Sequence, residues 1–184
     1  MDTLELINEA KQGSVAAQKY LFDQWAEKMM LVCRRYVKNR EDAEELMLDG
    51  FYKFFKKISS FIYQGDAGLY AWLKKIMINE CLMFLRKKNV FNMVTEASVE
   101  EIPLQEEALN NLSAEEIFNV VIQLPVGYRT VFNLYVIEGL THKEIAGLLG
   151  ISEGTSKSQF SKGKILLQKM LLQNDIEYAK RKSQ

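Results

Sequence analysis

The chain has 184 residues, 48% of them hydrophobic and 26% charged, with 24 basic and 24 acidic side chains. This composition is typical of a globular protein and excludes a disordered one. No apolar run approaches the roughly 18 residues of a membrane-spanning helix, and the N-terminus lacks the basic start and apolar core of a signal peptide. Cys33 and Cys81 are isolated cysteines, which favours a buried role in a reducing cytoplasm over a disulfide or a metal site.

The zero net charge hides an uneven distribution of charge along the chain. Residues 1–90 carry 15 basic and 12 acidic side chains, and residues 113–184 carry nine basic and seven acidic ones. Between them, residues 91–112 hold five glutamates and no basic residue. We therefore predict two mildly basic domains, residues 1–92 and 113–184, joined by an acidic flexible linker, residues 93–112, with at most a short helix at residues 105–110.

The N-terminal domain has helical periodicity throughout, which predicts an all-α fold of small helical domains. Helices are expected over residues 2–11, 14–37, 41–57 and 71–89, with a loop over residues 59–70. The third helix begins with acidic residues and ends with basic ones, as the helix dipole favours.

The loop between the third and fourth helices has a composition typical of a segment that binds single-stranded nucleic acid. Phe61, Tyr63 and Tyr70 can stack on unpaired bases, because every base has a π-face. Gln64 and Asp66 can form hydrogen bonds with the edge of a base. We predict that this loop binds single-stranded nucleic acid.

The C-terminal domain contains the pattern of a helix-turn-helix. Thr141 and Glu144 form a predicted capping box, Gly150 stands where the chain must become left-handed, and Ser152 caps a second helix. Such a second helix enters the major groove of duplex DNA. The alternative is a helical hairpin with a solvated lysine face. The polar tail after Leu172 is expected to fray.

Polar residues at the start of the second helix are candidates for contacts with bases, and flanking basic residues are candidates for contacts with phosphates. The base-contact candidates are Thr155, Lys157, Ser158, Gln159, Ser161 and Lys162. The phosphate-contact candidates are Arg129, Lys143 and Lys164. The single histidine, His142, follows the helix cap and is expected to lie on the surface.

These segments resemble a known family. The stretch DAEELMLDGFYKFF, followed by FIYQGDAGLYAWLKKIMINECLMFLR, resembles the second conserved region of bacterial sigma factors of the extracytoplasmic-function type. The stretch LPVGYRTVFNLYVIEGLTHKEIAGLLGISEGTSKS resembles their fourth region. The two resemblances cover roughly residues 10–90 and 113–172, in the order of the family. The chain departs from the common sequence of the family at two places. Ser156 stands where the family commonly has valine, and Lys162-Gly163-Lys164 stands where Arg-Ala-Arg is common.

The resemblance implies an alternative sigma factor that binds core RNA polymerase through its beta-prime clamp and beta flap and recognises promoter DNA, both duplex and single-stranded. It implies a cytoplasmic protein without a cofactor, held inactive by an anti-sigma partner and making no membrane contact of its own. The residues implied in core binding are Asp42, Glu45, Leu46, Asp49 and Phe54. Those implied in capturing a flipped base of the minus-ten element are the loop residues Phe61, Tyr63, Gln64, Asp66 and Tyr70 with Lys75, Asn79 and Arg86. The helix-turn-helix would bind the minus-thirty-five element.

Other readings of the sequence stay open. The acidic start of the third helix, taken alone, favours a solvated helix over core aromatics rather than a binding site. A helix-turn-helix regulator that does not bind polymerase would share the C-terminal domain but would not need the aromatic loop. A decoy that binds polymerase without DNA would tolerate loss of Lys157, Gln159 and Lys162. No set of residues has the spacing of a catalytic or metal site, so an enzyme is not expected.

Overall fold

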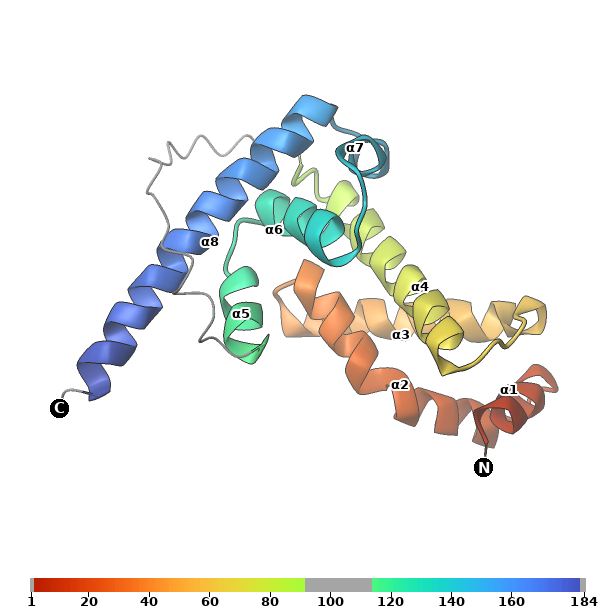
Figure 1. Ribbon diagram of the computed structural model, residues 1–184. Coiled ribbons are helices and arrows are strands. Elements are labelled where there is room, and N and C mark those ends of the chain that lie inside the picture. Colours follow the sequence, from red (N-terminus) through yellow and green to blue (C-terminus); the bar gives the residue numbers. More distant parts are fainter. Residues whose placement is uncertain (1, 92–113, 183–184) are drawn as a thin grey trace. The chain divides into compact units, whose positions relative to one another are not determined.

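The computed structural model describes residues 2–91 and 114–182, and every regular element within them is a helix (Figure 1). The chain divides into two compact units, Met1–Phe84 and Leu85–Gln184. The predicted all-α fold is confirmed. The predicted linker, residues 93–112, lies outside the described residues, and the domain limits stay predictions.

The first unit contains α1 (Thr3–Lys11), α2 (Val15–Tyr36), α3 (Arg40–Lys57), the 3₁₀ turn η1 (Ile58–Ser60) and α4 (Asp66–Lys87) up to Phe84. The starts of α2 and α3 are fixed by capping side chains just before each helix. Ser14 Oγ accepts a hydrogen bond from the Ala17 amide at 3.3 Å, and Asn39 Oδ1 accepts one from the Asp42 amide at 2.8 Å. These side chains satisfy amide groups that have no partner inside the helix.

The fourth helix begins earlier than predicted. Gly65 has a φ of +95°, a conformation that favours glycine, and α4 begins at the next residue. Asp66 in the first turn is favoured by the helix dipole. The predicted loop of residues 59–70 therefore ends at Gly65, and Asp66 and Tyr70 lie on the helix.

Close packing and one ion pair join α3 to α4. A Cβ atom on Gly50 would lie 2.3 Å from Met77 Sδ, so only glycine fits there without displacing Met77. Three residues along α3, Lys53 Nζ lies 2.5 Å from Glu80 Oε2, and Glu80 is 7% exposed. The pair compensates the burial of the Glu80 carboxylate.

Both cysteines are free and fully buried in the structure, which confirms their predicted buried role. Cys81 Sγ lies 4.0 Å from the Cys33 carbonyl oxygen. A hydrogen bond with Cys33, together with burial, raises the pKa of the Cys81 thiol well above its ordinary value. This favours the inert protonated form of the thiol.

The second unit comprises α5 (Ala114–Val121), α6 (Val126–Phe132), a π-helical turn η3 (Asn133–Ile137), α7 (His142–Leu149) and α8 (Glu153–Lys182) (Figure 1). Its core contains apolar side chains from α5, from the turn between α5 and α6, and from α8: Val120, Val121, Leu124, Leu167 and Leu171. Helix α8 extends to Lys182, so the expectation that the chain frays after Leu172 was wrong.

Helices α6 and α8 approach closely at Gly163. A Cβ atom at this buried position would lie 3.1 Å from Tyr128 Cβ and 3.6 Å from the Tyr128 carbonyl oxygen. The glycine in the interior of α8 is thus explained by the short distance between the two helices.

Candidate nucleic-acid interface

The helix-turn-helix has the predicted local geometry. The Glu144 carboxylate accepts hydrogen bonds from the Thr141 amide at 2.8 Å and from its hydroxyl at 2.7 Å. These bonds lower the pKa of Glu144. Gly150 adopts the left-handed conformation, with φ 69° and ψ 34°. Ser152 Oγ accepts a hydrogen bond from the Thr155 amide at 2.9 Å, which confirms it as the cap of α8.

One surface of the helix-turn-helix presents exposed polar residues. On α8 these are Lys157, Ser158, Ser161 and Lys164, and on α7 Lys143 is exposed as well. Lys157 Nζ lies 2.7 Å from Glu153 Oε1, and this hydrogen bond and charge lower the pKa of Glu153. An exposed ion pair of this kind contributes little stability, so Lys157 can exchange its carboxylate for a phosphate or a base.

Arg129 does not have the accessible position predicted for a phosphate contact. It is 5% exposed, and its Nη1 donates hydrogen bonds to the carbonyl oxygens of Ile122 at 2.9 Å and Leu124 at 3.0 Å. Burial lowers its pKa. The side chain instead holds the end of α5 against the start of α6, and the prediction of a phosphate clamp was wrong because its guanidinium is buried.

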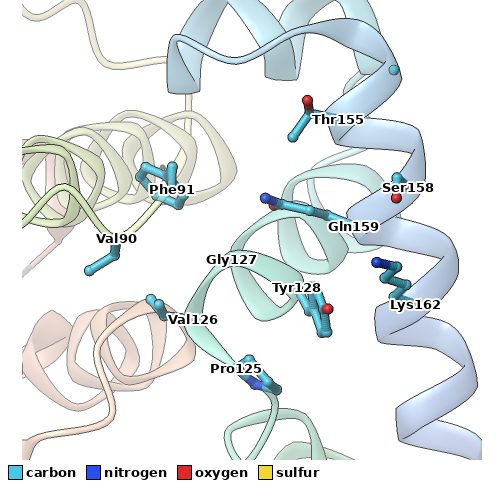
Figure 2. Close-up of a pocket in the computed structure, with 11 residues that line it drawn as sticks. Val90, Phe91, Pro125, Val126, Gly127, Tyr128, Thr155, Ser158, Gln159 and Lys162 are labelled. Carbon is cyan, nitrogen blue, oxygen red and sulfur yellow. The ribbon is translucent and has the colours of Figure 1, made fainter. Parts of the chain in front are cut away.

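Gln159 lies against α6 and not in solvent. Figure 2 shows its side chain reaching from α8 toward Gly127, in a pocket of the second unit that Thr155, Ser158 and Lys162 also line. A Cβ atom on Gly127 would lie 3.1 Å from Gln159 Oε1. That oxygen is buried without a hydrogen-bond partner among the described residues. The predicted contact of Gln159 with a base would require the side chain to leave this position.

His142 is half-buried and joins the two helices, contrary to the expectation of a surface residue. Its Nδ1 shares a hydrogen bond of 2.9 Å with Oγ of Ser156, which is 0% exposed. The imidazole also stacks on Tyr135, with ring centroids 4.5 Å apart and planes within 12°. Ser156 therefore has a specific polar partner where the family commonly has an apolar residue.

In the first unit, the predicted base-reading loop is held by contacts between its own side chains and α4. Phe61 stacks on Trp72, with ring centroids 4.6 Å apart and planes within 2°, and both rings are half-buried. Tyr63 Oη donates a hydrogen bond to Asp66 Oδ1 at 2.7 Å, which raises the pKa of Tyr63. The aromatic side chains are thus ordered without nucleic acid, and Ile62 between them is 76% exposed.

One face of α4 continues this surface. Lys75, Asn79 and Arg86 are all exposed, at spacings of four and seven residues that place them on the same side of a helix. Gln64, before the helix, and Asp66, its first residue, are also exposed, but Asp66 lies nine residues before Lys75 and so on the opposite side of α4. Tyr70 is half-buried and packs near Trp25. The structure therefore brings Lys75, Asn79 and Arg86 onto one face of α4.

Two of the residues assigned to core binding are buried. Leu46 is 7% exposed and Phe54 is 1% exposed, so both belong to the interior of the first unit and their assignment as contact residues was wrong. Glu45 and Asp49 are exposed and Asp42 is partly exposed. The exposed apolar residues of α3 are instead Leu48, at 49%, and Tyr52, at 66%.

A second apolar surface lies on the turn η3, which the sequence did not single out. Tyr135, Val136 and Ile137 are 40%, 53% and 43% exposed. Three successive exposed apolar residues are unusual on a soluble surface and are typical of a site for protein contact.

The described part of the chain holds no group of three or more His, Cys, Asp or Glu residues placed to bind a metal ion. None of its helices is both long and apolar enough to cross a membrane.

Two family models match the chain. Residues 21–90 match sigma-70 region 2, and residues 108–167 match sigma-70 region 4. The first match contains α3, α4 and the aromatic loop, and the second contains the helix-turn-helix.

Similar proteins include the ECF RNA polymerase sigma factor SigW of Bacillus subtilis, with 27% identity over 90% of this chain and 94% of the relative. The ECF RNA polymerase sigma factor SigM of Mycobacterium tuberculosis is 26% identical over 89% of this chain and 83% of its own length. Among solved structures, the sigma factor RpoE in complex with the anti-sigma factor NepR from Bartonella quintana has 25% identity and a TM-score of 0.48. It covers 84% of this chain and 96% of that one.

Proposed function

This chain belongs to the sigma-70 family, as an RNA polymerase sigma factor of the extracytoplasmic-function type, and we propose how its two units divide the work of initiation. A factor of this type binds core RNA polymerase, recognises promoter DNA and starts transcription. The observation that carries this conclusion is the occurrence of regions 2 and 4 in the order of the family.

We assign the domains as residues 1–92, the linker as residues 93–112 and the second domain as residues 113–184. The exposed face of α3 is the proposed contact with the polymerase clamp. It combines carboxylates at Glu45 and Asp49 with the apolar side chains of Leu48 and Tyr52. Apolar side chains beside carboxylates suit a basic, partly apolar partner surface.

The loop and the exposed face of α4 are the proposed site for the melted minus-ten element. The stacked rings of Phe61 and Trp72 form an ordered aromatic wall on which an unpaired base can stack. Lys75 and Arg86 can neutralise the phosphates of the displaced strand, and Asn79 between them can form hydrogen bonds with the edge of a base.

The exposed residues of α8 are the proposed contacts with the minus-thirty-five element. Lys157, Ser158 and Ser161 follow the capped start of the helix, which is the part of a recognition helix that reaches base edges. Lys143 and Lys164 flank them as proposed phosphate contacts. The exposed apolar turn at Tyr135–Ile137 is the proposed contact with the beta flap.

Sigma factors are initiation factors that bind DNA, and we propose that the polymerase performs all the chemistry. The protein then acts in the cytoplasm, where RNA polymerase is. Membership of the family also supports control by an anti-sigma protein that covers the polymerase-binding surfaces.

The test is run-off transcription with purified core RNA polymerase and genomic DNA of the source organism. Wild-type protein should give discrete transcripts that share an upstream motif. Asn79→Ala should weaken them, whereas Asn8→Ala, at an exposed position of α1, should not. Wild-type transcripts without a shared motif would contradict promoter recognition.

Core binding is tested separately by competition with another sigma factor for core polymerase. Tyr52→Ala should compete less well than wild type, and Tyr20→Ala is the matched control because Tyr20 is 63% exposed on α2. If the wild-type protein fails to bind core while the full chain still binds a specific duplex, it is a helix-turn-helix regulator and the proposed function is wrong.

A further inference from the structure

Ser156 is fully buried, at 0% exposure, and no other polar residue in the described part of α8 is buried. A buried hydroxyl costs free energy unless it has a hydrogen-bond partner. Its partner is His142 Nδ1 at 2.9 Å, which is 14 residues away in the sequence. The bond joins the first residue of α7 to the first turn of α8.

His142 is itself held from a third element. Its ring stacks on Tyr135 of η3 and lies 5.8 Å from the ring of Phe160, one turn further along α8 than Ser156. The Tyr135 and Phe160 rings are 4.6 Å apart. The imidazole therefore has little freedom, and a ring fixed in this way presents Nδ1 to Ser156 in one direction.

Helix α8 packs against α7 and, at Gly163, against α6. Helix α7 has eight residues, and its buried side chains are Ile145 and Leu149. Apolar contacts tolerate sliding, whereas a hydrogen bond weakens steeply with angle and distance. The bond thus restricts the rotation of α8 more than the valine common at position 156 would.

Ser156 directly precedes Lys157 and Ser158, which are exposed. A rotation or shift of α8 at Ser156 would therefore displace the side chains that reach base edges, while flexible lysines could still reach phosphates. We propose that His142 and Ser156 are positioning residues, and that their hydrogen bond sets how sharply the protein distinguishes the sequence of the upstream duplex. This inference rests on the proposed function, in which α8 enters promoter DNA.

The test measures binding of the holoenzyme, assembled from core polymerase and the full chain, to two duplexes. One carries an upstream element selected by the wild-type holoenzyme from a randomised library, and the other carries the same element scrambled. The ratio of the two affinities is the discrimination.

Two substitutions of His142 separate the hydrogen bond from the ring contact. His142→Phe keeps a ring to stack on Tyr135 but has no nitrogen, and His142→Asn keeps a polar atom near the position of Nδ1. We expect His142→Phe and Ser156→Ala each to lower discrimination about five- to tenfold, as loss of one hydrogen bond does. The double variant should lose no more than either one, because both remove the same bond. His142→Asn should retain most of the discrimination.

Affinity for the scrambled duplex and its dependence on salt should stay near wild type, because contacts with phosphates remain. Equal losses on both duplexes, accompanied by a lower unfolding temperature, would show a merely structural role and overturn the inference. If the double variant lost discrimination by the product of the two single losses, the inference would be overturned as well. A wild-type holoenzyme with no discrimination would instead refute the proposed function itself.

A second readout needs no DNA. His142 is the only histidine of the chain, so its imidazole NMR signals are identified without further assignment. Ser156→Ala should shift these signals, whereas Ser158→Ala, at the exposed face of α8, should leave them in place. Unshifted signals in Ser156→Ala would mean that the bond is absent in solution.

Discussion

Charged side chains of the second unit serve two different purposes, and burial separates them. Arg129 is buried and donates to main-chain carbonyls at the end of α5, whereas Lys143 and Lys164 are exposed. A buried guanidinium that donates to two carbonyl oxygens stabilises the fold, because hydrogen bonds with a charged donor are stronger than those between neutral groups.

Arg129→Met should therefore destabilise the second unit by about 1.5–3 kcal/mol, the range for hydrogen bonds to a charged group. Amide hydrogen exchange in α6 and α8 should become faster as a result of this loss of stability. The salt dependence of duplex binding should not change. Lys143→Met is the control with the opposite pattern: unchanged exchange, and a salt dependence reduced by about one phosphate contact. A reduced salt dependence in Arg129→Met would restore it as a phosphate contact.

The cap of α7 makes its stability depend on pH. The pKa of Glu144 is lower in the folded protein than its ordinary value, through hydrogen bonds from Thr141. A lowered folded-state pKa means that the stabilisation is present above the unfolded-state pKa and is lost as the pH falls through the folded-state pKa. Amide protection factors in α7 should decrease over that acidic range.

Glu144→Gln should abolish this acid-induced decrease while retaining part of the cap at neutral pH, since glutamine also serves in a capping box. Glu115→Gln removes a carboxylate at an exposed position of α5 and should leave the response of α7 unchanged. The same acid response in Glu144→Gln as in wild type would exclude Glu144 as its cause.

At the scale of elements, glycines determine how closely helices approach. Glycine in a helix costs about 1 kcal/mol relative to alanine through intrinsic propensity. At Gly163 the helix bears this cost because α8 lies in close contact with Tyr128 on α6. The nearest atoms are the Cβ and main-chain atoms of Tyr128, which cannot move aside easily.

Gly163→Ala should consequently fail to give the usual gain of about 1 kcal/mol and should destabilise the contact between α6 and α8, by an amount similar to that gain. Gly147→Ala is the matched control in α7, because a Cβ there meets nothing within 4 Å. It should stabilise its helix. Chemical denaturation followed by exchange of α6, α7 and α8 amides measures both. A stabilised Gly163→Ala would show that α6 can shift.

At the scale of the whole molecule, each unit has its own buried core. The interior of the first includes Leu21, Met29 and Leu73, and that of the second includes Leu124 and Leu134. Separate cores allow separate binding functions, and we propose that joining them in one chain converts the second binding event into an intramolecular one.

We expect the fragment of residues 1–92 to retain competition for core polymerase and to bind single-stranded DNA, but to lose discrimination of the upstream duplex. The physical reason is that the helix-turn-helix lies wholly in the second unit. Thermal unfolding of the fragment serves as the control for folding. A folded fragment that no longer competes for core would show that both units are needed for that contact.

Local sequence predicted the features whose partners lie within four residues. The capping box of Thr141 and Glu144, the left-handed Gly150 and the cap at Ser152 were all correct. Their geometry depends on the adjacent backbone, so the order of residues suffices to identify them. The sequence did not predict that α4 begins at Asp66, because the segment from Asp66 to Tyr70 has a composition typical of a loop.

The sequence by itself determined that this protein is all-α and that it carries regions 2 and 4 of a sigma factor, since helical period and linear motifs are written along the chain. Only the tertiary structure decided which side chains are available for binding. It buried Leu46, Phe54 and Arg129, placed Gln159 against α6 and paired His142 with Ser156. The reason is that burial and hydrogen bonding of these residues depend on neighbours from other helices, which the periodicity of a single helix does not specify.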